Sequence, residues 1–420
     1  MESGTADWWD DSKVINIDEV AESYGTPFFL YTADAINQRI NLIRESMDNL
    51  VEVFYAVKAN PNLGLLKAVR GTADGLDISS GGELEQAALA GFDMARISFA
   101  GPAKSSQELS ASIKRGVGCI SVESMRELMK CAELAKQIGI KANVLIRVNP
   151  QFLNRSFGMK MGGRPIQFGI DEEDLGMILH SVQENQAHIN FQGIHIYAGS
   201  QCFETAGVVE GVENTLRIAT EIESSTGLFC KTVNLGGGFG VSHTENNKEL
   251  DLQALAVELL PILRNFHKSS PNKREILFEL GRYLTADAGI YVSKVISSKE
   301  SRGKTFIMVD GGLHHHLAAA GTFGAAFRSN FLIKNLSRPE APVVSCNIAG
   351  PSCNPTDLLA VKVDLAKPEH GDLIAVLKSG SYGFTASPLL FLGRQTPAEL
   401  VVHNGEITLG RSPKTILDFN

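Results

Sequence analysis

Short apolar runs alternate with longer amphipathic stretches through the central part of the chain. Eight runs rich in β-branched or aromatic residues predict strands; they are residues 53–57, 75–79, 97–101, 118–122, 144–148, 191–198, 232–235 and 276–280. Between most of them, apolar residues recur at three- and four-residue spacing, as in 105–115, 124–138 and 210–225, which predicts amphipathic helices. Strands that are apolar on both faces are typical of a buried parallel sheet.

This alternation predicts the fold class. Eight parallel strands with intervening helices in about 230 residues have the size of a (β/α)8 TIM barrel. An open, doubly wound sheet is the alternative that the periodicity leaves. We therefore expect an α/β protein with the barrel over residues 35–284.

The pattern changes after Thr285. Strand-like runs at 290–298, 306–310, 343–349, 373–377 and 400–403 follow with Gly- and Pro-containing turns and little helix. They predict a second, mainly antiparallel β domain. Residues 28–31 form a further predicted strand, and we assign residues 1–34 and 285–420 to this β domain.

Composition narrows the classes of protein. The 420 residues are 44% hydrophobic and 20% charged, with a formal net charge of -8, which argues against a nucleic-acid or anionic-membrane surface. No run approaches the about 20 apolar residues of a membrane span, and the first ten residues lack the pattern of a secretory signal. The six cysteines are too sparse for a disulfide framework and form no Cys-x-x-Cys pair. We expect a cytoplasmic enzyme with reduced thiols.

Residues with chemical potential follow the ends of the predicted strands, where a TIM barrel gathers its functional groups. Five strand ends carry them: Lys58, Arg147, Tyr197 with Ser200, the glycines Gly236, Gly237 and Gly238, and Glu279 with Gly281 and Arg282. This coincidence predicts an active site at the carboxyl ends of the strands.

The lysine and the glycines suggest a cofactor. At the end of an apolar strand, desolvation is expected to lower the pKa of Lys58 and make its amine nucleophilic, unless the side chain snorkels or pairs with a carboxylate. Three glycines would let backbone N–H groups approach a phosphate, although tight βα turns also require glycine. Together they indicate a phosphorylated carbonyl cofactor or, alternatively, a sugar-phosphate aldolase.

Glu279 lies on an otherwise apolar strand. A buried carboxylate needs a cationic partner, and a protonated pyridine nitrogen would supply one. The alternative is a salt bridge to Arg282 or Arg147.

Several motifs, taken in order along nearly the whole chain, resemble the pyridoxal-phosphate (PLP) dependent decarboxylases of the diaminopimelate and ornithine type. They are residues 55–61, 77–83, 147–150, 193–201, 234–238, 279–282, 350–353 and 380–382. The resemblance implies an alanine-racemase-like barrel (fold type III) joined to a β domain, and a homodimer with active sites at the subunit interface.

The resemblance also implies roles for individual residues. Lys58 would carry PLP as a Schiff base, and Glu279 would keep the pyridine nitrogen protonated. Cys353, in a Gly-Pro-x-Cys string, would enter from the partner subunit and return a proton; a thiol pKa near 8.5 suits this task. A cysteine considered alone is more often a small buried hydrophobe. The remaining implied cofactor-binding residues are Asp77, Arg147, Tyr197, Ser200, Gly236, Gly237, Gly238, Gly281, Arg282 and Tyr382.

Three positions depart from the family pattern. Tyr197 stands where a histidine ring normally stacks on PLP, and a tyrosine still offers a flat face. Asn354 replaces an acidic residue that reads a distal ammonium, and the segment around His314–His316 replaces an arginine string that grips a distal carboxylate. We expect Asn354, Arg328 and His316 to read the distal end of the substrate. Free diaminopimelate is therefore a weaker candidate.

The strings at 160–163 and 167–169, with the triple histidine, are most similar to a side branch of the family that includes decarboxylases of glutamyl groups tethered to carrier proteins. Three consecutive histidines on a strand would face alternating sides, so we expect no metal site. A substrate-loop or dimer-interface role is the preferred interpretation.

We therefore predict PLP-dependent α-decarboxylation of an amino-acid substrate that is not necessarily free diaminopimelate. One alternative is a true meso-diaminopimelate decarboxylase of lysine biosynthesis, and an amino-acid racemase on the same barrel is another. The alternative from a different class is a non-catalytic PLP-binding or regulatory pseudoenzyme. The presence of Lys58, Glu279 and Cys353 together argues against that last reading.

Overall fold

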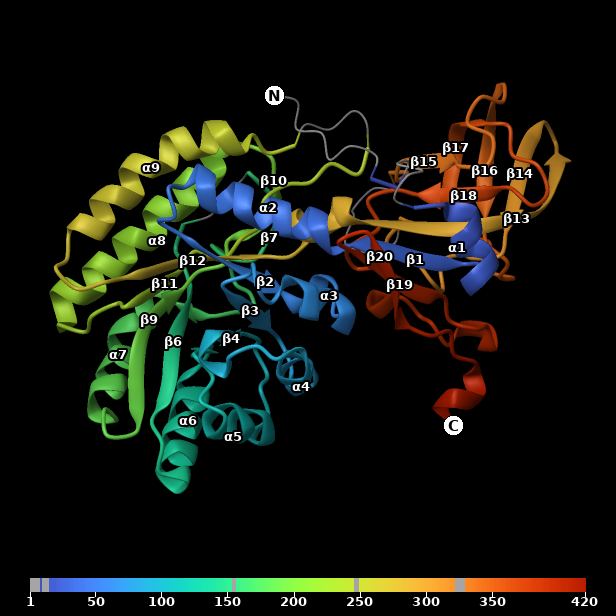
Figure 1. The fold of residues 1–420 in the computed structure, drawn as a ribbon. Helices are drawn as coiled ribbons and strands as arrows, with labels where there is room; N and C mark the ends of the chain where they lie inside the picture. The colour runs from blue at the N-terminus through green and yellow to red at the C-terminus, as the bar shows by residue number, and fades with distance from the viewer. Residues whose placement is uncertain (1–7, 10–14, 153–155, 245–248, 322–328) are drawn as a thin grey trace.

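The computed structural model describes residues 8–9, 15–152, 156–244, 249–321 and 329–420. Two parts lie side by side, a barrel surrounded by helices and a sheet domain that contains both the first described helix and the C-terminal strands (Figure 1). The predicted combination of a TIM barrel with a second β domain is confirmed.

Within the described residues, eight parallel strands close the barrel. They are β2 (Glu52–Ala56), β3 (Gly75–Ile78), β4 (Ile97–Phe99), β5 (Cys119–Val122), β6 (Ala142–Asn149), β9 (Ile189–His195), β11 (Thr232–Asn234) and β12 (Glu275–Leu280). Closure comes from the pairing of β12 with β2 and of β5 with β6. The open-sheet alternative is therefore wrong, because an open sheet would leave two edge strands without partners.

Helices cover the outside of the barrel (Figure 1). They are α2 (Ala33–Ser46), α3 (Leu63–Val69), α4 (Gly81–Ala90), α5 (Ser106–Lys114), α6 (Met125–Ile138), α7 (Leu175–Glu184), α8 (Thr205–Thr226) and α9 (Leu252–Lys268). Several begin at a side chain that accepts backbone N–H groups of the first turn, as Ser105 does at α5 and Asp251 at α9. Such caps define where each strand-following loop ends and its helix begins.

The second domain is a mixed, mainly antiparallel sheet. One path runs β17 (Leu358–Ala366), β16 (Val343–Ala349), β14 (Lys304–Val309), β13 (Gly289–Ser301), β1 (Phe28–Thr32), β19 (Ala398–His403) and β20 (Glu406–Arg411), while β18 (Leu373–Val376) joins β13 to β15 (Ile333–Asn335). Two pairings, β14 with β16 and β1 with β19, are parallel. The hydrophobic pattern did not predict β15, β17 and β20. β17 is irregular because Lys362 has a positive φ of 51° and its register against β16 shifts.

The strand β1 joins the two parts of the core. Phe29 and Tyr31 point into the large apolar cluster that continues through the barrel, whereas Phe28 and Leu30 point into a smaller cluster on the other face. Helix α1 (Ile17–Tyr24) covers that second face with Val20 and Ala21. Alternate residues of one buried strand therefore serve two cores.

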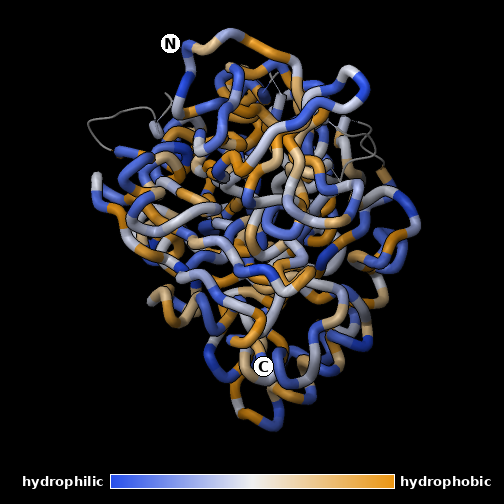
Figure 2. The backbone as a smooth tube through the Cα atoms, turned by 90° about the vertical axis from the view of Figure 1, so that its right-hand side faces the viewer, coloured by the Kyte–Doolittle hydropathy of each residue, from blue (hydrophilic) through white to orange (hydrophobic). Residues whose placement is uncertain are grey.

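Hydrophobic and hydrophilic residues alternate in short stretches along the backbone (Figure 2). In the described part of the chain, no helix combines the length and the apolar character needed to cross a bilayer. All six cysteines are unpaired.

Candidate active site

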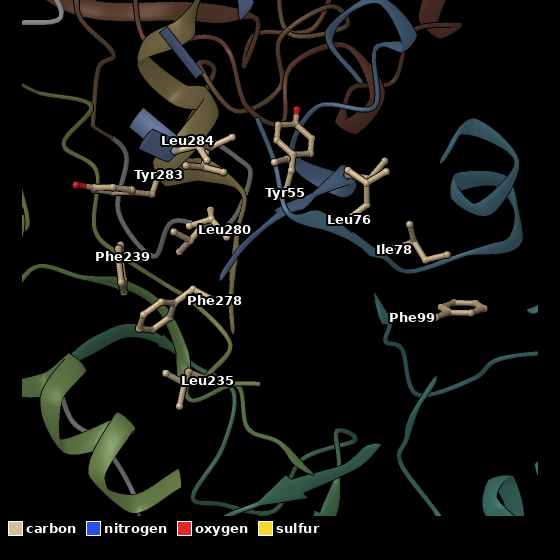
Figure 3. Packing of buried hydrophobic residues seen from close by; sticks show 14 of the residues in the cluster. Tyr55, Leu76, Ile78, Phe99, Leu235, Phe239, Phe278, Leu280, Tyr283 and Leu284 are labelled. Carbon is tan, nitrogen blue, oxygen red and sulfur yellow. The ribbon is translucent and has the colours of Figure 1, made fainter. Parts of the chain in front are cut away.

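A cavity of about 580 Å³ opens at the carboxyl ends of the barrel strands. Most of the site residues expected from the sequence line it: Lys58, Arg147, Tyr197, Ser200, Gly238, Glu279, Gly281, Arg282 and Tyr382. One wall rests on packed aromatic rings, where Phe239 lies 5.1 Å from Phe278 and 5.3 Å from Tyr283, centroid to centroid (Figure 3). The reactive groups are thus held on rigid core elements.

Lys58 lies in a short 3-10 turn directly after β2. Its Nζ donates to Asp77 Oδ2 at 2.7 Å, and 45% of its side chain remains exposed to the cavity. Burial acts to lower the pKa of Lys58, but the Asp77 carboxylate together with Tyr382 and Tyr197 outweighs burial, and the pKa is raised above its usual value. The lowered pKa expected from the sequence is therefore wrong, because the neighbouring strand β3 places a carboxylate beside the amine.

Asp77 itself is fully buried. Burial, with repulsion from Glu279, raises the pKa of Asp77 to about 6 even though Lys58 opposes the shift. Its other oxygen, Oδ1, has no hydrogen-bond partner among the described residues. The pair thus places an amine next to a carboxyl group that changes protonation close to neutral pH.

Glu279 is buried on β12 and is held by the neighbouring strand. Its Oε1 accepts from Asn234 Nδ2 at 2.5 Å, and the Oδ1 of Asn234 accepts from the backbone N–H of Gly236. Neither Arg147 nor Arg282 forms an ion pair with Glu279 in the described part of the chain. The salt-bridge alternative for Glu279 is therefore not what the fold provides.

His195 is the site residue that our sequence reading missed. It lines the cavity from β9, with Nε2 3.4 Å from Glu279 Oε2 and Nδ1 3.0 Å from Ser121 Oγ. Burial, with repulsion from Arg147, lowers the pKa of His195 to about 3, so the ring is neutral and its contact with Glu279 is not an ion pair. The signal in the sequence is a polar residue at an inward position of an otherwise apolar strand.

Arg147 does not bring an uncompensated charge to the cavity. Its Nη1 donates to Glu123 Oε1 at 2.8 Å, and its guanidinium lies over the Phe168 ring, 4.8 Å from the centroid. Burial alone would raise the pKa of Glu123, but Arg147 and other donors to the carboxylate hold it below its usual range. A cofactor-binding role for Arg147 stays a prediction.

The glycine turn after β11 is required by close packing. Gly236 and Gly238 have φ values of 64° and 92°, and a side chain on Gly238 would lie 2.0 Å from the carbonyl oxygen of Gly199. At Gly237 an added Cβ would lie 2.1 Å from the carbonyl oxygen of Glu279. Only glycine fits at these positions, and of the three, Gly238 lines the cavity.

Arg282 places a cationic group at the cavity, beside Tyr382. The Arg282 guanidinium stacks on the Tyr382 ring, 4.6 Å from its centroid, and its Nη1 lies 3.2 Å from His243 Nε2. Burial lowers the pKa of Arg282 and lowers that of His243 to about 3, so Arg282 faces a neutral ring. Ser200 lines the same cavity from β10 (Gly199–Cys202), which pairs with β7 (Phe157–Lys160) as a two-stranded ribbon.

Two of the residues expected to read the substrate, His316 and Asn354, are not among the described residues that line this cavity. His316 is fully buried in the β domain, where its Nε2 lies 2.9 Å from Ser379 Oγ and its ring packs on Phe29. Asn354 turns its Oδ1 to the N–H and hydroxyl of Thr356. Arg328 lies outside the described residues.

Cys353 is exposed and is not among the residues that line the cavity of its own chain. It lies in the connection between β16 and β17, on the β domain. No group of three or more His, Cys, Asp or Glu side chains in the described ranges has an arrangement that could hold a metal ion.

This site belongs to a recognisable class of enzyme. A family model for the pyridoxal-binding domain of pyridoxal-dependent decarboxylases matches residues 33–286. The chain therefore belongs to the pyridoxal-dependent decarboxylase family. The sequence-based resemblance, the fold type III architecture and the reaction class, amino-acid decarboxylation by a carboxy-lyase, are confirmed.

Individual relatives cover almost the whole chain. The L-glutamyl-[BtrI acyl-carrier protein] decarboxylase of Niallia circulans is 36% identical over 408 residues, which are 96% of this chain and 95% of that protein. The diaminopimelate decarboxylase of Bacillus subtilis is 31% identical and covers 95% of this chain and 92% of its own. The crystal structure of Helicobacter pylori diaminopimelate decarboxylase complexed with L-lysine superposes with a TM-score of 0.85 at 27% identity, covering 96% of this chain and 98% of that one.

Proposed function

We propose that this protein removes the α-carboxylate of an amino acid whose distal end carries no charge, and that a carrier-bound glutamyl thioester is its substrate. Loss of the α-carboxylate requires that this group be free, so the glutamyl unit would be attached through its side-chain carboxyl. The reaction would release carbon dioxide, add one proton at the α-carbon and leave a 4-aminobutanoyl thioester.

The character of the cavity lining carries this proposal. The charged residues that line the cavity in the described part of the chain are Lys58, Arg147, Glu279 and Arg282, and we assign all four to the cofactor end. The other lining residues include Met159, Met161, Phe168 and Pro102. A distal carboxylate or ammonium would need a charged or well-placed polar partner to repay its desolvation. An uncharged thioester has no such requirement.

The residues present fit pyridoxal phosphate as the cofactor. An anionic phosphate suits the end with Ser200, Gly238 and Arg282, and a basic ring nitrogen suits the buried Glu279. Because His195 beside it is neutral, Glu279 is the group that would pair with the ring nitrogen of the cofactor. When bound, PLP supplies the electron sink that makes loss of an α-carboxylate feasible.

The chain's own residues would manage the protons. The Asp77 carboxylate lies 2.7 Å from the Lys58 amine and would hold the protonated side chain in place at the cavity. Glu279 would hold the proton shared with the ring nitrogen. The Cys353 thiol would donate a proton to the α-carbon.

A homodimer is part of this proposal. Cys353 is exposed and lies outside the cavity of its own chain, so a second copy must bring the thiol to the site. We expect a dimer in solution and a cytoplasmic location. Mixing Lys58→Ala and Cys353→Ala subunits should restore activity, since each heterodimer would contain one intact site.

The test is carbon dioxide release by the PLP-loaded protein. The panel contains the γ-glutamyl thioester of a carrier protein, the same thioester on a short synthetic thiol, free glutamate, meso-diaminopimelate, ornithine and lysine. We expect turnover of the thioesters and none of free glutamate, whose side chain differs by its charge. Preferential turnover of a substrate with a charged distal end would refute the uncharged-end proposal.

meso-Diaminopimelate is the second candidate substrate. The Bacillus subtilis relative and the structural likeness to the Helicobacter pylori enzyme favour it. Turnover of diaminopimelate alone would establish this alternative. A protein that binds PLP at Lys58 yet releases carbon dioxide from no substrate would instead support the pseudoenzyme alternative.

A further inference from the structure

The loop that carries Cys353 is built around one buried carboxylate. Asp357 is 3% exposed and lies at the end of the connection between β16 and β17. Its Oδ2 accepts from the backbone N–H of Ser352 at 2.9 Å, directly before Cys353. Its Oδ1 accepts from the backbone N–H of Leu313 at 2.6 Å, in the segment after β14.

The surrounding backbone is shaped to admit this carboxylate. An ideal Cβ on Gly312 or Gly350 would lie 2.4 or 2.3 Å from Asp357 Oδ1, so a larger residue at either position would displace it. The backbone of Asp357 also closes the loop, because its carbonyl accepts from Gly350 N–H and its N–H donates to the Asn354 carbonyl. The carboxylate therefore joins two loops that are about 40 residues apart in the sequence.

Burying a carboxylate costs free energy because the group loses its water. That loss is offset only where hydrogen-bond donors are well placed around its oxygens. No described Lys, Arg or His forms an ion pair with Asp357; its oxygens are satisfied by backbone N–H groups. The loop's Cys353 side chain, in contrast, is left exposed. The arrangement fixes the backbone next to the thiol while leaving the thiol free to reach another molecule.

We propose that Asp357 is a positioning residue, which holds Cys353 at the correct place for proton transfer by tethering Ser352 to Leu313. This inference rests on the proposed function, because it assigns Asp357 to the residue that would return the proton. It adds that the segment after β14, which includes the triple histidine, is the anchor of the Cys353 loop.

Hydrogen exchange tests the tether without any substrate. In Asp357→Asn, tested as the PLP-loaded protein, the side chain keeps one oxygen and gains an NH2 group. One of the two backbone N–H groups that donate to Asp357 would then face this NH2 group and lose its acceptor. We expect exchange in residues 311–316 and 350–354 to accelerate about ten-fold, while β16 and β17 stay protected. Asp364→Asn, which changes an exposed carboxylate on the following strand β17, is the matched control and should change nothing. Unchanged exchange in Asp357→Asn would overturn the tether.

Kinetics on the substrate found by the panel test the positioning role. Asp357→Asn should lower kcat about ten-fold with KM altered less than about two-fold, and Asp357→Asn added to Cys353→Ala should cause no further loss. Multiplicative losses in the double variant would overturn a role through Cys353. If Asp357→Asn loses its cofactor absorbance, Gly350→Ala, which displaces the carboxylate without removing it, replaces it in both assays. If the wild-type protein turns over nothing, the proposed function fails while the exchange result still decides the tether.

Discussion

The Lys58–Asp77 pair predicts an asymmetry between two substitutions. Lys58→Met leaves the Asp77 carboxyl fully buried, with Oδ1 already lacking a hydrogen-bond partner among the described residues. Asp77→Asn instead removes the buried charge and leaves Lys58 with 45% of its side chain exposed to the cavity, where water can solvate it. The first change should therefore destabilise the fold much more than the second.

The magnitude follows from the cost of an unpaired buried charge. Removing one partner of a buried ion pair costs about 3–5 kcal/mol, and we expect about 3 kcal/mol for Lys58→Met at pH 8 because the carboxyl can escape part of the cost by binding a proton. For Asp77→Asn we expect a change within about 1 kcal/mol, since the amide oxygen can still accept from Lys58.

The pH dependence has a definite sign. The folded-state pKa of Asp77, about 6, lies above its usual value of 3.8, so the folded protein binds this proton more tightly than the unfolded chain. The contribution of Asp77 to stability is thus greatest at low pH and is lost as the pH rises through about 6. Lys58 lowers the pKa of Asp77, so Lys58→Met raises it further and extends this loss to higher pH.

Thermal unfolding of the cofactor-free protein at pH 5 and pH 8 measures the asymmetry. Lys58→Met should lower Tm at pH 8 by roughly 3 °C and much less at pH 5, whereas Asp77→Asn should stay close to wild type at both. The double variant Lys58→Met/Asp77→Asn, which buries no charge, should recover most of the loss. Equal losses in the two single variants, or a larger loss at pH 5, would refute the reasoning.

Four further substitutions test other parts of the structure. Gly238→Ala should abolish the cofactor absorbance, because its Cβ would lie 2.0 Å from a carbonyl oxygen at a φ of 92°. Gly211→Ala on α8, where an added Cβ would meet no atom within 4 Å outside the backbone of its own helix, should leave the absorbance intact and raise stability by up to about 1 kcal/mol. Lys104→Met should cost about 3–5 kcal/mol in chemical denaturation, since a side chain 1% exposed now satisfies two backbone carbonyls and a glutamate. His314→Leu should be neutral or stabilising by calorimetry, because both ring nitrogens are buried without a hydrogen-bond partner in the described residues; a loss above about 2 kcal/mol would contradict this.

The barrel could be predicted because its signal is local. Each parallel strand is buried on both faces and is therefore apolar over most of its length, and each following helix has its own apolar period, so the order of elements can be predicted from the chain. The positions of Lys58, Glu279 and Arg282 followed from the same pattern, because TIM barrels place strand ends at one mouth. The β domain was less legible. Its irregular strand β17, with Lys362 at a positive φ, does not follow a simple alternation.

The partners of these side chains were decided by the tertiary structure. Whether Lys58 has a raised or a lowered pKa depends on Asp77, which the register of β2 against β3 places beside it. In the same way, the contact between His195 on β9 and Glu279 on β12 depends on the strand order of the barrel, in which β11 pairs with both of these strands. The sequence determined which chemical groups gather at the barrel mouth, since burial and periodicity are properties of each segment. Only closure of the sheet decided which groups touch and hence their charge states, because those contacts join strands far apart in the chain.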